Sequence, residues 1–116
     1  MRDSKMYIAV LNDFPDFMVP TLVAHSVLAA HLQFNGKSEV YDDWLVNSFK
    51  KVVVRVNNKE FDKISSTLNC HVGFEKHTLG GLPSCLVVEP VYYEDIPNVL
   101  KFAKAWKPKE EASVSN

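Results

Sequence analysis

Residues 20–34 read PTLVAHSVLAAHLQF, and this stretch decides the fold. Proline suits the first turn of a helix, and Asn35-Gly36 provides a common helix end, so residues 20–34 are predicted to form one helix. Its apolar side chains spread around most of the helix instead of forming one stripe. A helix that is apolar nearly all round is expected to be buried on more than one side.

The residues before this helix complete the first unit of a layered fold. Residues 6–11, MYIAVL, form an apolar run that is predicted to be a central strand, buried on both faces. Residues 12–16, NDFPD, have the composition of a turn. Strand, polar loop and apolar helix indicate an α/β fold, in which ligands gather at the loops beyond the carboxyl ends of strands.

The remaining chain continues the alternation. Residues 51–56, KVVVRV, are rich in β-branched side chains, and Asn57 with Glu60 forms the signature of a capping box at the start of a helix. The predicted elements are strands at 6–11, 51–56, 70–74 and 84–88, helices at 20–34 and 58–68, a short helix or structured loop at 39–46, and a loop at 75–83. A last helix with Pro97 near its start presents an inner face of Ile96, Val99, Leu100, Ala103 and Trp106.

This order, β-α-(α)-β-α-β-β-α, predicts an α/β fold: a four-stranded mixed sheet with helices on both faces. Residues 1–107 are expected to form a single domain, and residues 108–116 a polar, disordered tail with too little apolar content to pack. The side chains expected to be mostly buried are Leu22, Val27, Leu28, Val53, Leu86 and Leu100.

Composition excludes little but sets the class. The 116 residues carry a formal net charge of −1, which gives no overall attraction to nucleic acid or membrane. No apolar stretch is expected to approach the ~20 residues needed to span a bilayer, so a cytoplasmic protein without a membrane partner is predicted. Cys70 and Cys85 fit no metal or redox spacing, so no metal and no cofactor is expected.

Several stretches resemble the type-2 peptidyl-tRNA hydrolase family. Asn12-Asp13-Phe14 resembles its turn after the first strand, and residues 23–30, VAHSVLAA, resemble its buried helix. Residues 50–56, KKVVVRV, are similar to its second strand, and residues 86–90, LVVEP, to its last strand. The resemblance covers roughly residues 5–106 and implies that family's fold. The sequence is also similar to uncharacterised relatives of the family.

The sequence departs from the family where the chemistry is expected. The family has a glycine-lysine pair at the entry to its first helix, and Met18-Val19-Pro20-Thr21 stands there without a lysine. His25 falls on the family's helix glutamine, and Leu28 falls on its histidine. Residues 73–78, GFEKHT, fall near its Asp-Ala-Gly-Arg-Thr-Gln loop, with Glu75 close to the missing aspartate.

The resemblance implies hydrolysis of the ester between peptide and tRNA. Asp13, His25, Glu75 and Thr78 would then surround the attacking water, with a carboxylate or an imidazole as general base. Ordinary structural roles remain open for two of them: Asp13 as a turn residue that bonds its own backbone, and His25 as a core histidine. The alternative function is a non-catalytic relative that binds RNA or protein.

Basic residues supply the expected RNA contacts. Lys50, Lys51, Arg55, Lys59 and Lys63 lie on one strand and the next helix, where they would contact phosphates of tRNA. An ordinary solvated surface is the alternative. A homodimer is the other expected partnership, because this family is often dimeric and because Tyr41, Trp44, Tyr92 and Tyr93 offer aromatic anchors.

Overall fold

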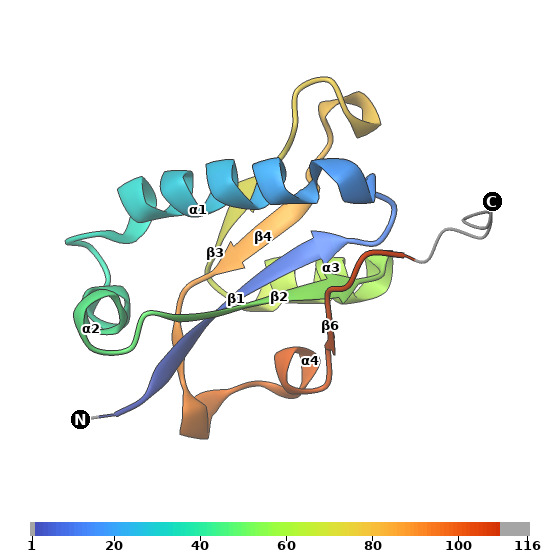
Figure 1. Cartoon of the computed structure of the whole chain (residues 1–116). Helices are drawn as coiled ribbons and strands as arrows, with labels where there is room; N and C mark the ends of the chain where they lie inside the picture. The colour runs from blue at the N-terminus through green and yellow to red at the C-terminus, as the bar shows by residue number, and fades with distance from the viewer. Residues whose placement is uncertain (1, 110–116) are drawn as a thin grey trace.

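Strand β1 (Ser4–Leu11) lies in the middle of a mixed sheet that organises the described residues, 2–109, of the computed structural model (Figure 1). Its partner β2 (Lys50–Val56) is parallel to it along its whole length, from Lys5 opposite Lys50 to Leu11 opposite Val56. On the other side, β4 (Cys85–Val88) is antiparallel to β1, and β3 (Cys70–Gly73) continues the sheet beyond β4.

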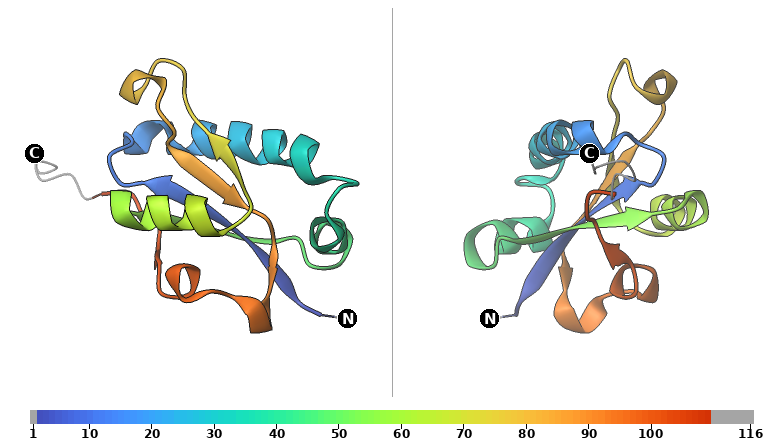
Figure 2. Two further views of the ribbon diagram at one scale, coloured as in Figure 1. Left: turned by 180° about the vertical axis from the view of Figure 1, so that it is seen from behind. Right: turned by 45° about the vertical axis from the view of Figure 1, so that its right-hand side comes forward.

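Helices cover both faces of the sheet, as predicted (Figure 2). Helices α1 (Val19–Phe34) and α2 (Glu39–Asn47) lie on one face, and α3 (Asn58–Thr67) and α4 (Asn98–Lys101) on the other. Alternation along β1 feeds both cores. Met6, Ile8 and Val10 face α1 and α2, whereas Tyr7 and Ala9 face α3 and α4.

The α/β mixed sheet is confirmed, but four strands were predicted and the sheet has six. The two extra strands are short. Strand β5 (Val91–Tyr92) pairs with the start of β1, just after the Glu89-Pro90 interruption that ends β4. Strand β6 (Lys104–Ala105) pairs with β2. A strand of two residues is too short to show a periodic pattern, so the sequence does not predict it.

The predicted last helix is wrong beyond Lys101. Pro97 precedes four helical residues, and the chain then turns so that Ala105 pairs with Val54 and the Trp106 amide donates to the Val53 carbonyl at 2.8 Å. Helical spacing predicted that Trp106 shares one face with the other four apolar residues, and this is wrong. Trp106 packs with the α1 and α2 core, whereas the opposite core contains Ile96, Val99, Leu100 and Ala103. Pairing with β6 also covers part of an otherwise open edge of β2.

Helix α1 is buried on one side only, contrary to the prediction. A single stripe of Val19, Leu22, Ser26, Ala30 and Phe34 faces the sheet. The reason is its position: the main contacts of α1 with the sheet are to β3 and β4. Leu22, Leu86 and Leu100 are buried as predicted, Val27 and Val53 are half-buried, and Leu28 is 67% exposed.

Two further expectations concern membrane-spanning stretches and the C-terminal tail. Within the described residues, one helical stretch, Asp16 to Phe34, is long and apolar enough to cross a membrane by length and composition. It has 19 residues and includes the short helix η1 (Asp16–Met18). The sequence had been expected to contain no such stretch. Core helices of non-membrane proteins pass the same test, and 28% of this window is buried against the domain. Of the predicted tail, residues 110–116 lie outside the described residues, and Lys109 is held by the loop after β1.

Candidate functional site

An apolar groove opens on the α1 and α2 face, between α1, α2 and the parallel pair of β1 and β2. Its volume is about 630 Å³. Ile8 and Val53 of the sheet form its floor, α1 forms one wall, and α2 with the residue pair that follows it closes one end. The lining side chains are Ile8, Val23, Ala24, Val27, Leu28, His31, Tyr41, Trp44, Leu45, Phe49, Lys51 and Val53.

The end wall is a row of aromatic rings that α2 positions. Ser38 caps this helix, its hydroxyl accepting from the Tyr41 amide at 3.2 Å. Ring centroids then follow one another from Tyr41 to Trp44 at 5.2 Å and from Trp44 to Phe49 at 5.3 Å. The Trp44 indole donates to the Lys50 carbonyl at 2.8 Å, which ties α2 to the start of β2. Of the three rings, Phe49 is exposed on the groove, and Tyr41 and Trp44 support it from the core.

Two polar contacts interrupt the apolar lining. His31 Nδ1 lies 2.8 Å from the Tyr41 hydroxyl. Lys51 Nζ donates to the Phe49 carbonyl at 2.7 Å and lies 3.2 Å from the centroid of the Phe49 ring. Burial lowers the pKa of the Lys51 ammonium. Phe49 adopts a left-handed backbone, with φ of 63°, which lets its ring and its carbonyl both face the lysine.

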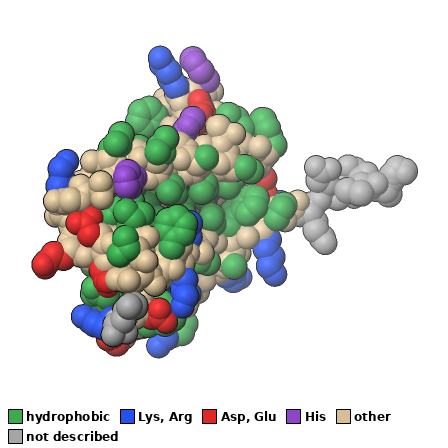
Figure 3. All heavy atoms as spheres, turned by 60° about the vertical axis from the view of Figure 1, so that its left-hand side comes forward, with side chains coloured by type: hydrophobic (Ala, Val, Ile, Leu, Met, Phe, Trp, Pro, Cys, Tyr) green, Lys and Arg blue, Asp and Glu red, His purple; other side chains and the backbone are tan. Residues whose placement is uncertain are grey.

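Hydrophobic side chains gather over this face in the space-filling view (Figure 3). Leu28 and Phe49, on the groove itself, are 67% and 57% exposed, and Leu32, one turn beyond Leu28 on α1, is 73% exposed. Between Val19 and Phe34 the helix has no Asp, Glu, Lys or Arg. Contiguous apolar surface of this kind, rimmed by polar groups, marks an interaction site.

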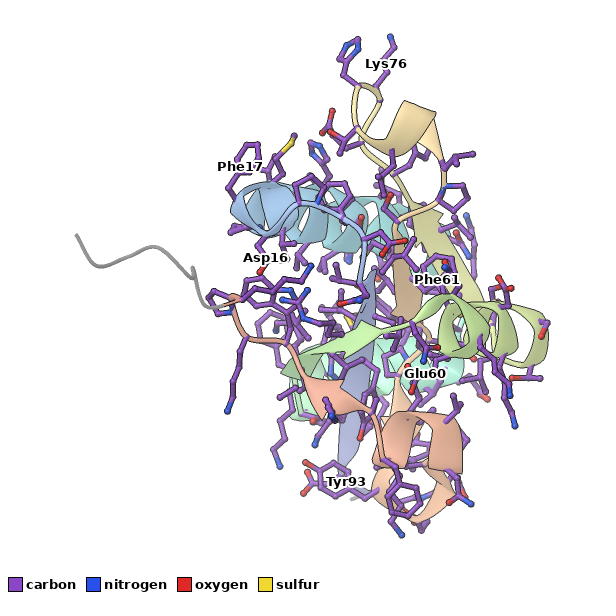
Figure 4. All side chains as sticks on the ribbon, turned by 90° about the vertical axis from the view of Figure 1, so that its right-hand side faces the viewer. Asp16, Phe17, Glu60, Phe61, Lys76 and Tyr93 are labelled. Carbon is purple, nitrogen blue, oxygen red and sulfur yellow. The ribbon has the colours of Figure 1, made fainter. Side chains whose placement is uncertain are left out.

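Two of the four expected catalytic residues are in contact. His25 lies on the outer side of α1, and its Nε2 is 3.3 Å from Oε2 of Glu75, a residue of the connection between β3 and β4. Thr78 lies in the same connection, but its hydroxyl is directed to the Met18 sulfur at 3.3 Å. The tip of this connection projects away from the sheet at Lys76 (Figure 4).

Asp13 is not part of that contact. Its exposed carboxylate lines a separate hollow with Asn58, Phe61 and Asp62 of α3, together with Leu79 and Leu82 of the connection. The His25 side chain is 52% exposed and lines neither the groove nor the hollow at Asp13. The four residues therefore do not converge on one cavity.

The expected basic face is divided among separate places. Lys50 pairs with Asp3 at 3.2 Å, Lys51 lines the groove, and Lys59 and Lys63 are exposed on α3, on the opposite face of the sheet. The Arg55 guanidinium is already occupied. It donates to both oxygens of Asp16, each at 3.1 Å, and to the Lys107 carbonyl at 2.6 Å.

The aromatic anchors expected for a homodimer are divided too. Tyr41 and Trp44 are 2% and 1% exposed, so they belong to the core. Tyr92 is half-buried beneath the Arg2 guanidinium, 3.7 Å from its ring, and Tyr93 is exposed. Neither pair forms a continuous aromatic surface.

The thiols have structural surroundings. Burial raises the pKa of the Cys70 thiol to about 11 and that of Cys85 to about 12. No group of three or more His, Cys, Asp and Glu side chains within residues 2–109 is arranged to hold a metal ion.

The groove was missed by the sequence analysis. Its signal was present: a sixteen-residue helix without a formal charge has more apolar surface than one contact with a sheet can cover. Which side remained bare depended on the lateral position of α1. No known family model matches the sequence, and no curated protein sequence matches it at a significant level.

Proposed function

We propose that this protein is a non-catalytic binding module whose groove receives apolar side chains of a partner protein. The observation that carries the proposal is the preformed apolar groove, about 630 Å³, that continues into the exposed Leu28 and Leu32 of α1. Each large side chain that a partner buries there contributes ~1.5–3 kcal/mol from the hydrophobic effect.

A protein partner suits this surface better than RNA does. Modules for single-stranded nucleic acid combine a basic groove with stacking aromatic rings. Here Lys51 is the one formally charged side chain among the lining residues, and Lys50 and Arg55 are paired with carboxylates. The remaining expected lysines, Lys59 and Lys63, lie on the other face of the sheet.

Selection from a phage-displayed library of random 16-residue peptides tests this proposal. Wild-type protein is expected to enrich peptides that bind with a Kd in the micromolar range. Leu28→Asp should weaken their binding by at least ~10-fold, as loss of a central apolar contact does. Leu82→Asp is the matched control, because Leu82 is 63% exposed on the connection between β3 and β4. Equal losses in both variants, or no enriched peptide, would contradict the proposal.

The second candidate is a hydrolase similar to peptidyl-tRNA hydrolases. The contact between His25 and Glu75 supports it, because a carboxylate can orient an imidazole that acts as general base. Without a helix-entry lysine, stabilisation of the negative ester oxygen is reduced, and one missing donor typically costs ~10²–10³ in rate.

The test of this candidate is hydrolysis of a peptidyl-tRNA analogue by the purified protein. If this candidate holds, turnover is slow, His25→Ala lowers it, and Thr21→Lys raises it. If the wild-type rate equals the buffer blank and Thr21→Lys does no better, the hydrolase candidate fails and the binding module remains.

A further inference from the structure

We infer that the groove binds one amphipathic α-helix of a partner protein, with an acidic side chain of that helix set against Lys51. This inference rests on the proposed function, since it names the occupant of the same groove. It goes further by fixing the partner's secondary structure and the sign of its charge.

The fold leaves the place of one helix empty on this face. Helix α1 lies over β3 and β4, and α2 stands at one end of the face (Figures 1 and 2). The groove opens between these two helices and β2. Helices that pack side by side lie 8–10 Å apart. A helix laid beside α1 would therefore lie along the groove and meet Val23, Val27 and Leu28, whereas Ile8 is already buried beneath the groove.

An extended strand fits the same place less well. It would have to pair with the open edge of β2, but β6 already pairs with Val54 and Arg55, and the Val53 carbonyl accepts from Trp106. Lys51 and the left-handed Phe49 stand at the remaining part of the edge. Lysines and irregular backbone at an edge oppose strand addition.

The charge of the groove selects an acidic partner. Among the described residues no carboxylate lies within ion-pair distance of Lys51, whose single hydrogen bond is to a carbonyl. Two of the three acidic side chains of α2 are engaged elsewhere: Asp42 accepts from the Gly36 amide, and Asp43 accepts from Asn47 and Tyr92. An aspartate or glutamate beside the apolar stripe of the incoming helix would pair with Lys51.

The exposed rim favours a helix over a small amphiphile or a lipid surface. Leu28 and Leu32, four residues apart on α1, extend the apolar surface beyond the groove, and a small ligand would leave Leu32 uncovered. Helices that lie in a membrane interface carry Lys and Arg on their polar side, and α1 carries neither.

The test uses the tightest peptide from the random library selection and two charge variants of the protein. The peptide is expected to show apolar residues at i, i+3, i+4 and i+7 with an acidic residue beside them, and to gain helical circular dichroism on binding. Changing that acidic residue to Lys should weaken binding to wild-type protein roughly two- to fivefold. Lys51→Glu should reverse this preference, and Lys63→Glu, on the opposite face, should leave it unchanged.

Five results would overturn the inference. If the enriched peptides bind without gaining a helical signal, the partner is not a helix. If Lys51→Glu leaves their charge preference unaltered, the acidic side chain does not pair with Lys51. In both cases, loss of binding in Leu28→Asp would still support the proposed function. Binding to phosphatidylcholine–phosphatidylglycerol vesicles that Leu28→Asp abolishes, with no peptide enriched, assigns the face to a membrane. A dimer mass in light scattering that Leu28→Asp converts to a monomer assigns the groove to a second copy. Failure of Leu28→Asp to affect any ligand contradicts the proposed function itself.

Discussion

Gly73 of β3 lies so close to Ser26 of α1 that a Cβ atom on Gly73 would lie 2.0 Å from the Ser26 Oγ and 2.9 Å from its Cβ. Glycine is thus required for close approach of the helix to the strand, at the point where α1 is pressed onto its side of the sheet. This contact helps to hold α1 over β3 and β4, beside the groove.

Gly73→Ala is expected to destabilise the fold by about 1–3 kcal/mol, the usual cost of forcing a methyl group into a packed contact. Ser26→Gly in the same chain removes both clashing atoms, so the double variant should lose less than the two single variants add up to. Urea unfolding of the four proteins measures this coupling. Additive losses would show that helix and strand do not meet as closely as described.

Leu28 and Leu22 make a matched pair on one helix. Leu22→Ala should cost about 2–5 kcal/mol, because Leu22 is 1% exposed in the core. Leu28→Ala should change stability by no more than about 0.5 kcal/mol, because Leu28 is 67% exposed. Thermal or urea unfolding of both variants compares them. A large loss of stability in Leu28→Ala would show that α1 is buried on two sides, as its composition predicts.

The pairing of Asp16 with Arg55 makes stability depend on acid. Hydrogen bonds from Arg55 hold the pKa of the Asp16 carboxyl below its ordinary value near 3.8, with a smaller contribution from the Lys109 amide. Because the pKa is lower in the folded state, this stabilisation is complete above the unfolded pKa and is lost as pH falls through the folded one.

Asp16→Asn should therefore be less stable than wild type by about 1–3 kcal/mol at pH 7, and the gap should narrow as pH falls below about 4. Urea unfolding at pH 7, 4 and 2.5 measures it. Asp62→Asn on the exposed side of α3 is the control and should match wild type at pH 7. A gap that stays constant with pH would contradict the pairing.

The cysteines should be unreactive in the folded protein. With pKa values of about 11 for Cys70 and about 12 for Cys85, at most roughly one thiol in a thousand is ionised at pH 8. Iodoacetamide should label both at least ~100-fold more slowly in buffer than in denaturing urea, where the pKa returns to about 8.5. Rapid labelling of Cys70 in buffer would show that β3 opens readily.

The sequence predicts the layers of this fold because the main elements carry strong local signals. The KVVVRV run and the capping box of Asn57 and Glu60 both appear in the structure as read, and the box forms both of its hydrogen bonds. Long-range placement carries no such signal. The lateral position of α1 depends on Gly73 meeting Ser26, 47 positions apart, and the two-residue strands β5 and β6 depend on partners elsewhere in the chain.

The same distinction applies to the site. The family resemblance implied one site for Asp13, His25, Glu75 and Thr78; His25 and Glu75 do meet, whereas Asp13 lies in a separate hollow. Arg55, expected at phosphates, is instead held by Asp16, because Asp16 follows the strand that is parallel to β2 (Figure 4). The groove needs α1, α2 and β2 at once, so no local pattern predicts it.

The most direct measurement is a ¹⁵N–¹H correlation spectrum of the protein, recorded as the tightest selected peptide is added. The account predicts that amide shifts concentrate in residues 23–32 of α1, residues 41–49 of α2 and its extension, and residues 51–53 of β2, and that Leu28→Asp abolishes them. Shifts that concentrate instead on the connection between β3 and β4, or on α3, would contradict the claim that this groove is the binding site.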